Sequence, residues 1–227
     1  MEGSSGTRRR LSAADRRAAI LEAALDVFSE RGFSEASLDD VATRGGISKA
    51  LIYEHFDSKR ELQVVLLDTY MHDLIEAVVS AVAAVETDEE RLRAGIESYL
   101  VYAAKRPSVL RLLTRNVSDP VAGKTIDRLR EEAAGAIASI MAQNAPELHP
   151  GDPDLKTTVA IVAHLMVGGI QFLASWWIDH PEVPRESVVE LAMGVHWIGL
   201  ERLGDGVRWK RDPGGGAHAL RAPGGPA

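Results

Sequence analysis

The chain has 227 residues, 45% of them hydrophobic and 26% charged, which is enough apolar sequence for a folded protein of one or two domains and excludes a disordered chain. It contains no cysteine, which excludes disulfides, thiolate metal sites and a thiol nucleophile, and fits a reducing cytoplasm. The net charge is −7, but residues 1–60 carry equal numbers of basic and acidic side chains. The acidic excess therefore lies in residues 61–227, and the front of the chain remains able to meet a polyanion.

The first sixty residues predict three helices. Apolar side chains recur at spacings of three and four from Ser12 to Arg31, where Gly32 ends the first helix. Ser37 begins a capping box that opens a short helix through Arg44. The pair Gly45-Gly46 breaks this helix, and Ser48 caps a third helix that ends near His55.

The rest of the chain also predicts helices, with no strand-like alternation of useful length, so the expected fold class is all-α. A long helix begins at a second capping box, Ser58 and Glu61, and runs to about Val85. The further helices are expected at Asp88–Lys105, Ser108–Arg115, Pro120–Gln143, Pro153–Ile178 and Pro184–Leu203, with prolines at most of the breaks, Pro146 included. The segment 204–227 is rich in Gly and Pro and is predicted to be disordered.

Two features bear on membranes and export. The amino terminus lacks the apolar core of a signal peptide, so we expect a cytoplasmic protein. The run Val159–Ile178 is long enough to span a membrane. However, His164, Gly168, Gln171 and Ser175 form one polar or small stripe along it, which favours a helix buried by its neighbours. We therefore expect no membrane partner.

The first three helices, with their glycine corner, have the outline of a helix-turn-helix. The side chains that can form its small core are Leu21, Leu25, Phe28, Leu38, Val41, Ala42, Ile47, Ile52 and Phe56. Ser48, Lys49, Leu51 and Glu54 are then left on the outer side of the third helix, with Tyr53, His55 and Lys59 toward its end. A DNA major groove admits one such helix.

The stretch SLDDVATRGGISKALIYEHFDSKREL, Ser37 to Leu62, resembles the amino-terminal signature of TetR-type transcriptional regulators. The upstream AALDVFSERGFSEAS also matches. The resemblance implies a ligand-responsive regulator, a repressor, that binds a pseudo-palindromic double-stranded DNA operator as a homodimer and is released by a small-molecule effector. It implies a DNA-binding domain at 1–57 with a basic arm, a ligand-binding and dimerisation domain at 58–203, and the tail at 204–227. The expected DNA-contacting residues are Ser37, Arg44, Ser48, Lys49, Ala50, Leu51, Tyr53, Glu54, His55 and Lys59.

The chain departs from the family pattern at Ala50, Leu51 and Glu54. Leu51 can meet a thymine methyl group, and Glu54 can accept a hydrogen bond from cytosine N4. The alternative is that Glu54 points to solvent and only lowers non-specific affinity. The run Arg8–Arg10 has two readings as well, a solvated tail or an arm that enters the minor groove.

The resemblance also implies a dimer interface and a ligand pocket in the last helices. The expected interface residues are Gly168, Gly169, Val188, Leu191, Ala192, Val195 and Gly199. The two adjacent glycines would permit close helix approach, and simple tolerance in a loose core is the alternative. The expected pocket residues are Tyr99, Tyr102, Arg111, Met141, His164, Gln171, Phe172 and Trp176. Core packing or a surface position is the alternative for each of them alone.

An enzyme is the rival class, and its motifs are missing. The sequence AGKT at Ala122–Thr125 lacks the first glycine of a phosphate loop, because Ser118 stands there. Nor does the chain contain a Glu-x-x-His pair, a Gly-x-Ser-x-Gly elbow or a His-Glu-x-x-His motif. We therefore expect no enzyme, no cofactor and no metal site. The alternatives are a helical protein-binding scaffold and a bundle enzyme without recognisable catalytic motifs.

Overall fold

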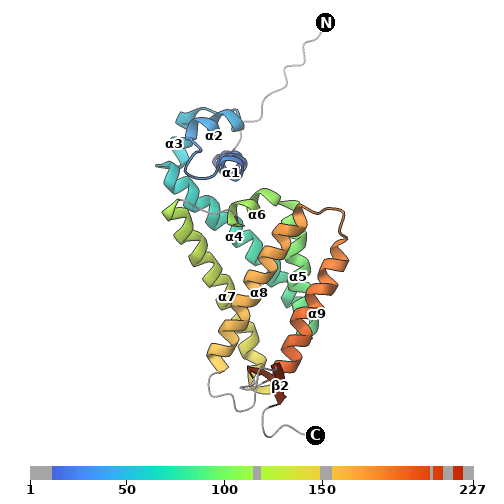
Figure 1. The fold of residues 1–227 in the computed structure, drawn as a ribbon. Coiled ribbons are helices and arrows are strands. Elements are labelled where there is room, and N and C mark those ends of the chain that lie inside the picture. Colours follow the sequence, from blue (N-terminus) through green and yellow to red (C-terminus); the bar gives the residue numbers. More distant parts are fainter. Residues whose placement is uncertain (1–11, 115–118, 149–154, 205–206, 212–216, 222–227) are drawn as a thin grey trace.

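The computed structural model describes residues 12–114, 119–148, 155–204, 207–211 and 217–221 (Figure 1). These residues form nine helices: α1 (Ala13–Arg31), α2 (Leu38–Gly45), α3 (Lys49–His55), α4 (Lys59–Ala83), α5 (Asp88–Lys105), α6 (Pro107–Thr114), α7 (Pro120–Leu148), α8 (Leu155–Ile178) and α9 (Arg185–Gly204). Figure 1 shows α1 to α3 gathered at one end, with α4 leading from them into a body of long helices. The all-α fold class is confirmed.

Hydroxyl caps set where the early helices begin. The Ser37 hydroxyl accepts a hydrogen bond from the Asp40 N–H at 3.1 Å, and the Asp40 carboxylate accepts one from the Ser37 N–H at 2.9 Å. Ser48 caps α3 through the Leu51 N–H. Ser58 caps α4 through the Glu61 N–H, but the Glu61 carboxylate reaches back to the Asp57 N–H instead of completing the predicted box. The predicted starts of these helices are therefore confirmed, and one cap is built differently.

The two adjacent glycines between α2 and α3 have separate roles. Gly46 has φ 60° and ψ 33°, in the left-handed region that a glycine reaches without steric cost. Gly45 lies where α2 approaches α1, and a Cβ added there would lie 3.2 Å from Cβ of Ala23. The first glycine therefore permits the close packing of two helices, and the second turns the chain into α3.

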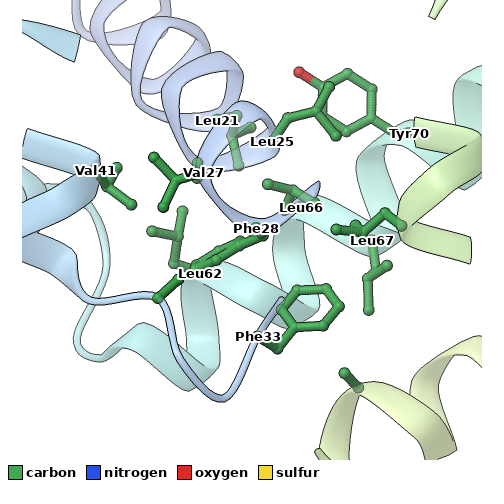
Figure 2. Packing of buried hydrophobic residues seen from close by; sticks show 14 of the residues in the cluster. Leu21, Leu25, Val27, Phe28, Phe33, Val41, Leu62, Leu66, Leu67 and Tyr70 are labelled. Atoms are coloured by element: carbon green, nitrogen blue, oxygen red, sulfur yellow. The ribbon is translucent and has the colours of Figure 1, made fainter. Parts of the chain in front are cut away.

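The largest hydrophobic cluster begins in the first three helices and does not stop there. Figure 2 shows Phe28 of α1 and Leu62 of α4 packed together, with Val41 of α2 beside them. The same cluster continues through Leu66 to α6 and α7. A second cluster joins α5, α8 and α9. The position of α3 is thus fixed by a core that it shares with the body of the molecule.

Two parts of the chain differ from the sequence-based expectation. Within the segment predicted to be disordered, β1 (Val207–Arg211) pairs with β2 (Ala217–Arg221) in an antiparallel hairpin with Val207 opposite Arg221. The prediction is wrong for these ten residues, because the Gly and Pro content between them concealed two short runs that can pair. α7 extends to Leu148, past the predicted end at Gln143, because a proline disfavours a helix without always ending it. The Arg8–Arg10 run lies outside the described residues.

Candidate nucleic-acid interface and ligand cavity

α3 presents a polar outer face and a buried inner face. Its inner side chain Ile52 is fully buried, and Phe56 at its end is buried too. Ser48, Lys49, Ala50 and Glu54 are exposed, and the Tyr53 side chain remains 52% exposed although it is large and aromatic. Leu51 is half-buried and packs against the main cluster. Because Ile52 and Phe56 anchor the inner side of this short helix, its outer side is free to contact a partner.

Lys49 and Arg44, two of the predicted DNA-contacting cations, are held in ion pairs. Lys49 Nζ lies 2.8 Å from the Asp39 carboxylate, and this hydrogen bond raises the pKa of Lys49 above its ordinary value. Arg44 pairs with Glu30 at 2.5 Å and with Asp26 at 3.4 Å, both on α1. A phosphate that binds either cation must therefore displace a solvent-exposed carboxylate, which is an inexpensive exchange at a surface.

The remaining predicted contact residues are Lys59 at the start of α4, His55 at the end of α3 and Ser37 at the start of α2. Lys59 opens α4, and its Nζ donates to the Ser34 carbonyl at 3.3 Å. His55 is half-buried, and its Nε2 has no hydrogen-bond partner among the described residues. Ser37 is occupied by the cap of α2. The predicted residues thus lie on α2, on α3 and at the start of α4, and the Ser37 hydroxyl is already engaged.

The body of the molecule encloses an apolar cavity of about 250 Å³. Its walls are side chains of α4, α5, α7 and α8, with Leu113 from α6 and Trp197, Leu200 and Glu201 from α9. Three of the predicted pocket residues, Tyr99, Met141 and Gln171, line it. A largely apolar cavity with a few polar groups is the usual form of a small-molecule site.

Five predicted pocket residues lie outside this cavity. Tyr102 donates its hydroxyl to the Tyr70 carbonyl at 3.0 Å and packs beside the cavity. Arg111 is exposed on α6, and together with the Arg44 hydrogen bond its charge lowers the pKa of Glu30. His164 is exposed on α8 and lies 3.2 Å from Glu131 of α7. These positions correct the prediction, which could not tell the inner faces of the helices from their outer faces.

The other two residues, Phe172 and Trp176, lie on the surface. They belong to an exposed apolar surface of α8 and α9, here called the α8/α9 face: Ile161, Leu165, Phe172, Trp176, Leu191, Val195 and Ile198. The Phe172 side chain is 70% exposed and the Leu191 side chain 74%. Exposed apolar patches of this kind mark interaction sites in soluble proteins.

The predicted dimer residues divide between this face and the core. Leu191, Val195, Gly169 and Gly199 are exposed, while Gly168 is half-buried, and a Cβ added to it would meet nothing within 4 Å. Val188 and Ala192 are buried against α5 in their own chain, which makes them unavailable to a partner and corrects the prediction for both. α9 is apolar on two adjacent faces, and spacing alone assigned both faces to one stripe.

α8 is the one described helix that is long and apolar enough to cross a membrane by length and composition. Its polar side chains have internal uses, because Gln171 lines the cavity and Ser175 Oγ lies 3.4 Å from Thr114 Oγ1 of α6. Its apolar character is thus shared between packing within the chain and the α8/α9 face. Among the described residues, no group of three or more possible metal ligands is found.

Two arginines near the candidate sites were not predicted from the sequence. Arg130 of α7 lines the cavity, but an isolated arginine in an amphipathic helix gives no signal. Arg106 follows α5 and reaches Glu22 of α1 at 2.8 Å, with its guanidinium 5.2 Å from the centre of the Tyr70 ring. Only the packing of α1 against α6 brings these groups together. Arg106 therefore links α1, which packs with α2, to the C-terminal end of α5, a helix that lines the cavity.

The comparisons with known proteins cover both ends of the molecule. Residues 20–64 match the model of bacterial regulatory proteins of the tetR family, and residues 89–199 match that of a tetracyclin repressor-like C-terminal domain. The chain is 33% identical over 187 residues to the HTH-type transcriptional regulator EthR of Mycolicibacterium smegmatis, with 79% of this chain and 83% of EthR covered. It is 28% identical over 204 residues to the HTH-type transcriptional activator FasR of the same species, with 87% of this chain and 90% of FasR covered.

Solved structures share the fold. A TetR-like transcriptional regulator from Rhodococcus sp. RHA1 superimposes with a TM-score of 0.68 at 26% sequence identity, with 84% of this chain and 98% of that chain covered. The similarity thus extends beyond the first three helices to the helices that enclose the cavity.

Proposed function

Because the chain belongs to the tetR family of bacterial regulatory proteins and is a ligand-responsive transcription regulator, we propose that it acts as a homodimeric repressor in the bacterial cytoplasm. It binds a pseudo-palindromic DNA operator through α3 of each subunit and is released when a small molecule occupies the cavity. The observation that carries this proposal is the outer face of α3, where Lys49, Tyr53 and Glu54 are exposed while Ile52 anchors the helix. Side chains of these types read base edges and phosphates in a major groove.

The homodimer is supported by the α8/α9 face. Leu191 and Val195 are more than two-thirds exposed in the single chain, and Phe172 continues the same apolar character on α8. A second copy of the chain that packs these helices against their twins would remove this surface from water. A two-fold dimer then presents two copies of α3 to two half-sites, which is why the operator is expected to be pseudo-palindromic.

Release by a ligand requires that the ligand bind the DNA-incompetent arrangement more tightly than the competent one. The contact of Arg106 with Glu22 and Tyr70 supports a route for this coupling. A change at the cavity end of α5 reaches α1 through this group and changes the separation of the two copies of α3.

The experiment is to select bound sequences from random double-stranded DNA with the full chain, and then to measure affinity for the selected site by fluorescence anisotropy. Tyr53→Ala should weaken binding strongly. Lys156→Ala, which removes an exposed charge at the start of α8, is the matched control and should bind as the wild type does. If no sequence is enriched, the proposal of an operator is wrong. In cells, the protein should repress a promoter that is fused to the selected site. Activation of this promoter would mean that the protein is an activator and not a repressor.

A further inference from the structure

The cavity is long and narrow. Along α4 its wall extends from Met71 to Val82, and along α5 from Asp88 to Tyr99. Each stretch of eleven helical steps corresponds to about 16 Å. Its volume of about 250 Å³ is spread over that length. A cavity of this shape fits a flexible chain better than a compact ring system.

One buried polar side chain in the wall lacks a partner. The fully described part of the chain buries four polar side chains: Ser29, Gln63, Thr125 and Gln171. The first three donate to backbone carbonyls, those of Asp26, Phe33 and Val121 respectively. Gln171 is only 7% exposed and lines the cavity, and no described residue forms a hydrogen bond with its amide. Its amide is not among the fully buried polar groups that lack a partner, so it is accessible from the cavity, where a ligand group can form the hydrogen bond that the chain does not supply.

Two further donors line the same cavity. Arg130 donates one terminal N–H to the Leu113 carbonyl at 2.8 Å and places the other 3.6 Å from the Asp127 carboxylate, while its buried Nε has no partner among the described residues. No described residue forms a hydrogen bond with the Tyr99 hydroxyl either. Burial raises the pKa of Tyr99 above its ordinary value, an effect that the nearby charge of Arg130 opposes only in part, so this hydroxyl keeps its proton at neutral pH. Leu113 is the cavity residue contributed by α6, so Arg130 lies at the α6 end of the cavity.

The opposite end has a different character. Asp88 and Arg91 pair with each other at 2.8 Å, and Glu201 is exposed. The polar groups that remain for a ligand are thus the Gln171 amide, the Tyr99 hydroxyl and the Nε of Arg130, and Val78, Val82 and Ile140 are among the apolar residues of the wall. Three donors, one of them cationic, and an apolar channel define a recognisable ligand chemistry.

We propose that the cavity binds a hydrocarbon chain that ends in an acyl oxygen, a carboxylate or its ester, with that oxygen held by Gln171, Arg130 and Tyr99 and the chain lying along α4 and α5. This inference rests on the proposed function only in taking the cavity as the effector site. The binding chemistry follows from the wall itself.

The test measures binding to the purified full-length protein by titration calorimetry, without DNA. Decanoate supplies the free carboxylate, methyl decanoate the ester, and decylamine the same chain length with a cationic head that accepts no hydrogen bond. Decanoate should bind at least tenfold more tightly than decylamine, because a charge-assisted hydrogen bond is replaced by repulsion from Arg130. The affinity for methyl decanoate should lie between these two affinities. Tighter binding of methyl decanoate than of decanoate would identify the ester as the preferred form.

The variants are Gln171→Met, Arg130→Met and Tyr99→Phe, each of which removes a polar group with little loss of volume. Each variant should weaken decanoate binding by about tenfold and reduce the difference in affinity between decanoate and decylamine. Gln143→Met makes the same change at an exposed position of α7 outside the cavity and should leave decanoate affinity unchanged. Gln171→Met should also raise Tm in the absence of ligand, because it replaces an amide that faces a largely apolar cavity without a hydrogen-bond partner, and this rise shows that the variant is folded.

Equal binding of decanoate and decylamine, or unchanged decanoate affinity in all three variants, would overturn the polar anchor. Failure of every probe to bind would overturn the acyl-chain assignment. Neither result affects the test of the proposed function, because the DNA selection uses the protein without ligand. Conversely, acyl binding by a protein that enriches no DNA sequence would leave this site intact and remove the proposed function.

Discussion

Lys49 is paired with Asp39 in the free protein, and this pairing determines what each substitution should do. If Lys49 contacts one phosphate on DNA, Lys49→Ala should weaken binding to all sequences and lower the salt slope by ~1. Asp39→Asn should do the opposite at low salt, because it frees the ammonium and removes a negative charge that faces the DNA backbone. Fluorescence anisotropy at two salt concentrations measures both effects. Unchanged affinity and slope in both variants would remove Lys49 from the interface.

Glu54 tests sequence reading rather than general affinity. Its side chain is exposed on the outer face of α3, where it can accept a hydrogen bond from cytosine N4. Glu54→Ala should then relax the preference at one symmetric pair of operator positions by ~1–3 kcal/mol. Competition between the selected site and its single-base variants measures this change. A uniform gain in affinity for every site would instead mean that the carboxylate only repels the phosphate backbone.

At the level of single elements, α2 depends on an ionised cap. Hydrogen bonds from the Ser37 side chain and backbone, with help from Arg31, lower the pKa of Asp40. A carboxyl with a lowered pKa in the folded state stabilises that state above its unfolded pKa of about 3.9, and this contribution disappears as the pH falls through the folded value.

Asp40→Asn should therefore lower Tm at pH 7, and the difference from the wild type should shrink as the pH falls below about 4. Thermal melting followed by circular dichroism over this pH range measures it. Glu76→Gln, an exposed position within α4 and away from any cap, is the control for the loss of a carboxylate. A Tm difference that stays constant with pH would mean that the ionised cap does not stabilise α2.

The helix starts and the core of the first three helices were predictable because they depend on neighbours in sequence. Ser37 and Ser48 cap the helices that their spacing indicates, and Gly46 takes the positive φ expected of it. The position of Phe172 was not predictable in this way. It lies close in sequence to Gln171, yet one side chain faces solvent and the other the cavity. Which face of α8 is inner depends on where α7 and α9 pack, and periodicity does not carry that information.

The same limit explains Arg130 and Val188. Nothing local distinguishes Arg130, which pairs with Asp127 at 3.6 Å, from Arg128 of the same helix, which pairs with Asp68 away from the cavity. Val188 shares an apolar spacing with Val195, but the first packs against α5 and the second is 72% exposed. The existence of a cavity and of an interface was expected from family resemblance, whereas their boundaries required the packed structure.

For the whole molecule, the decisive substitution is Leu191→Glu on the α8/α9 face. The side chain is 74% exposed in the single chain, so the subunit should fold normally, but a dimer that covers it would bury an unpaired charge at a cost of several kcal/mol. Sedimentation should show a monomer. Operator binding should weaken greatly, because each monomer covers one half-site and loses the additive contacts of its twin.

Ala104→Glu introduces the same charge at an exposed position on α5 and is the matched control, expected to remain a dimer with wild-type affinity. A Leu191→Glu protein that stays dimeric would place the interface on another surface. If it is monomeric but binds the operator as before, the requirement for two copies of α3 is wrong.

The hydrophobic cluster that runs from α1 through α4 to α6 and α7 limits how this regulator can be re-engineered. A chimaera cut after residue 57 would keep Phe28 but replace Leu62 and Leu66, against which α1 packs, and it would separate Glu22 from Arg106. Grafting α3 onto a foreign body therefore requires that the first part of α4 and the facing side of α6 travel with it. Operator specificity is easier to transplant by exchanging the exposed positions of α3 alone, because Lys49, Ala50, Tyr53 and Glu54 contribute nothing to that shared core.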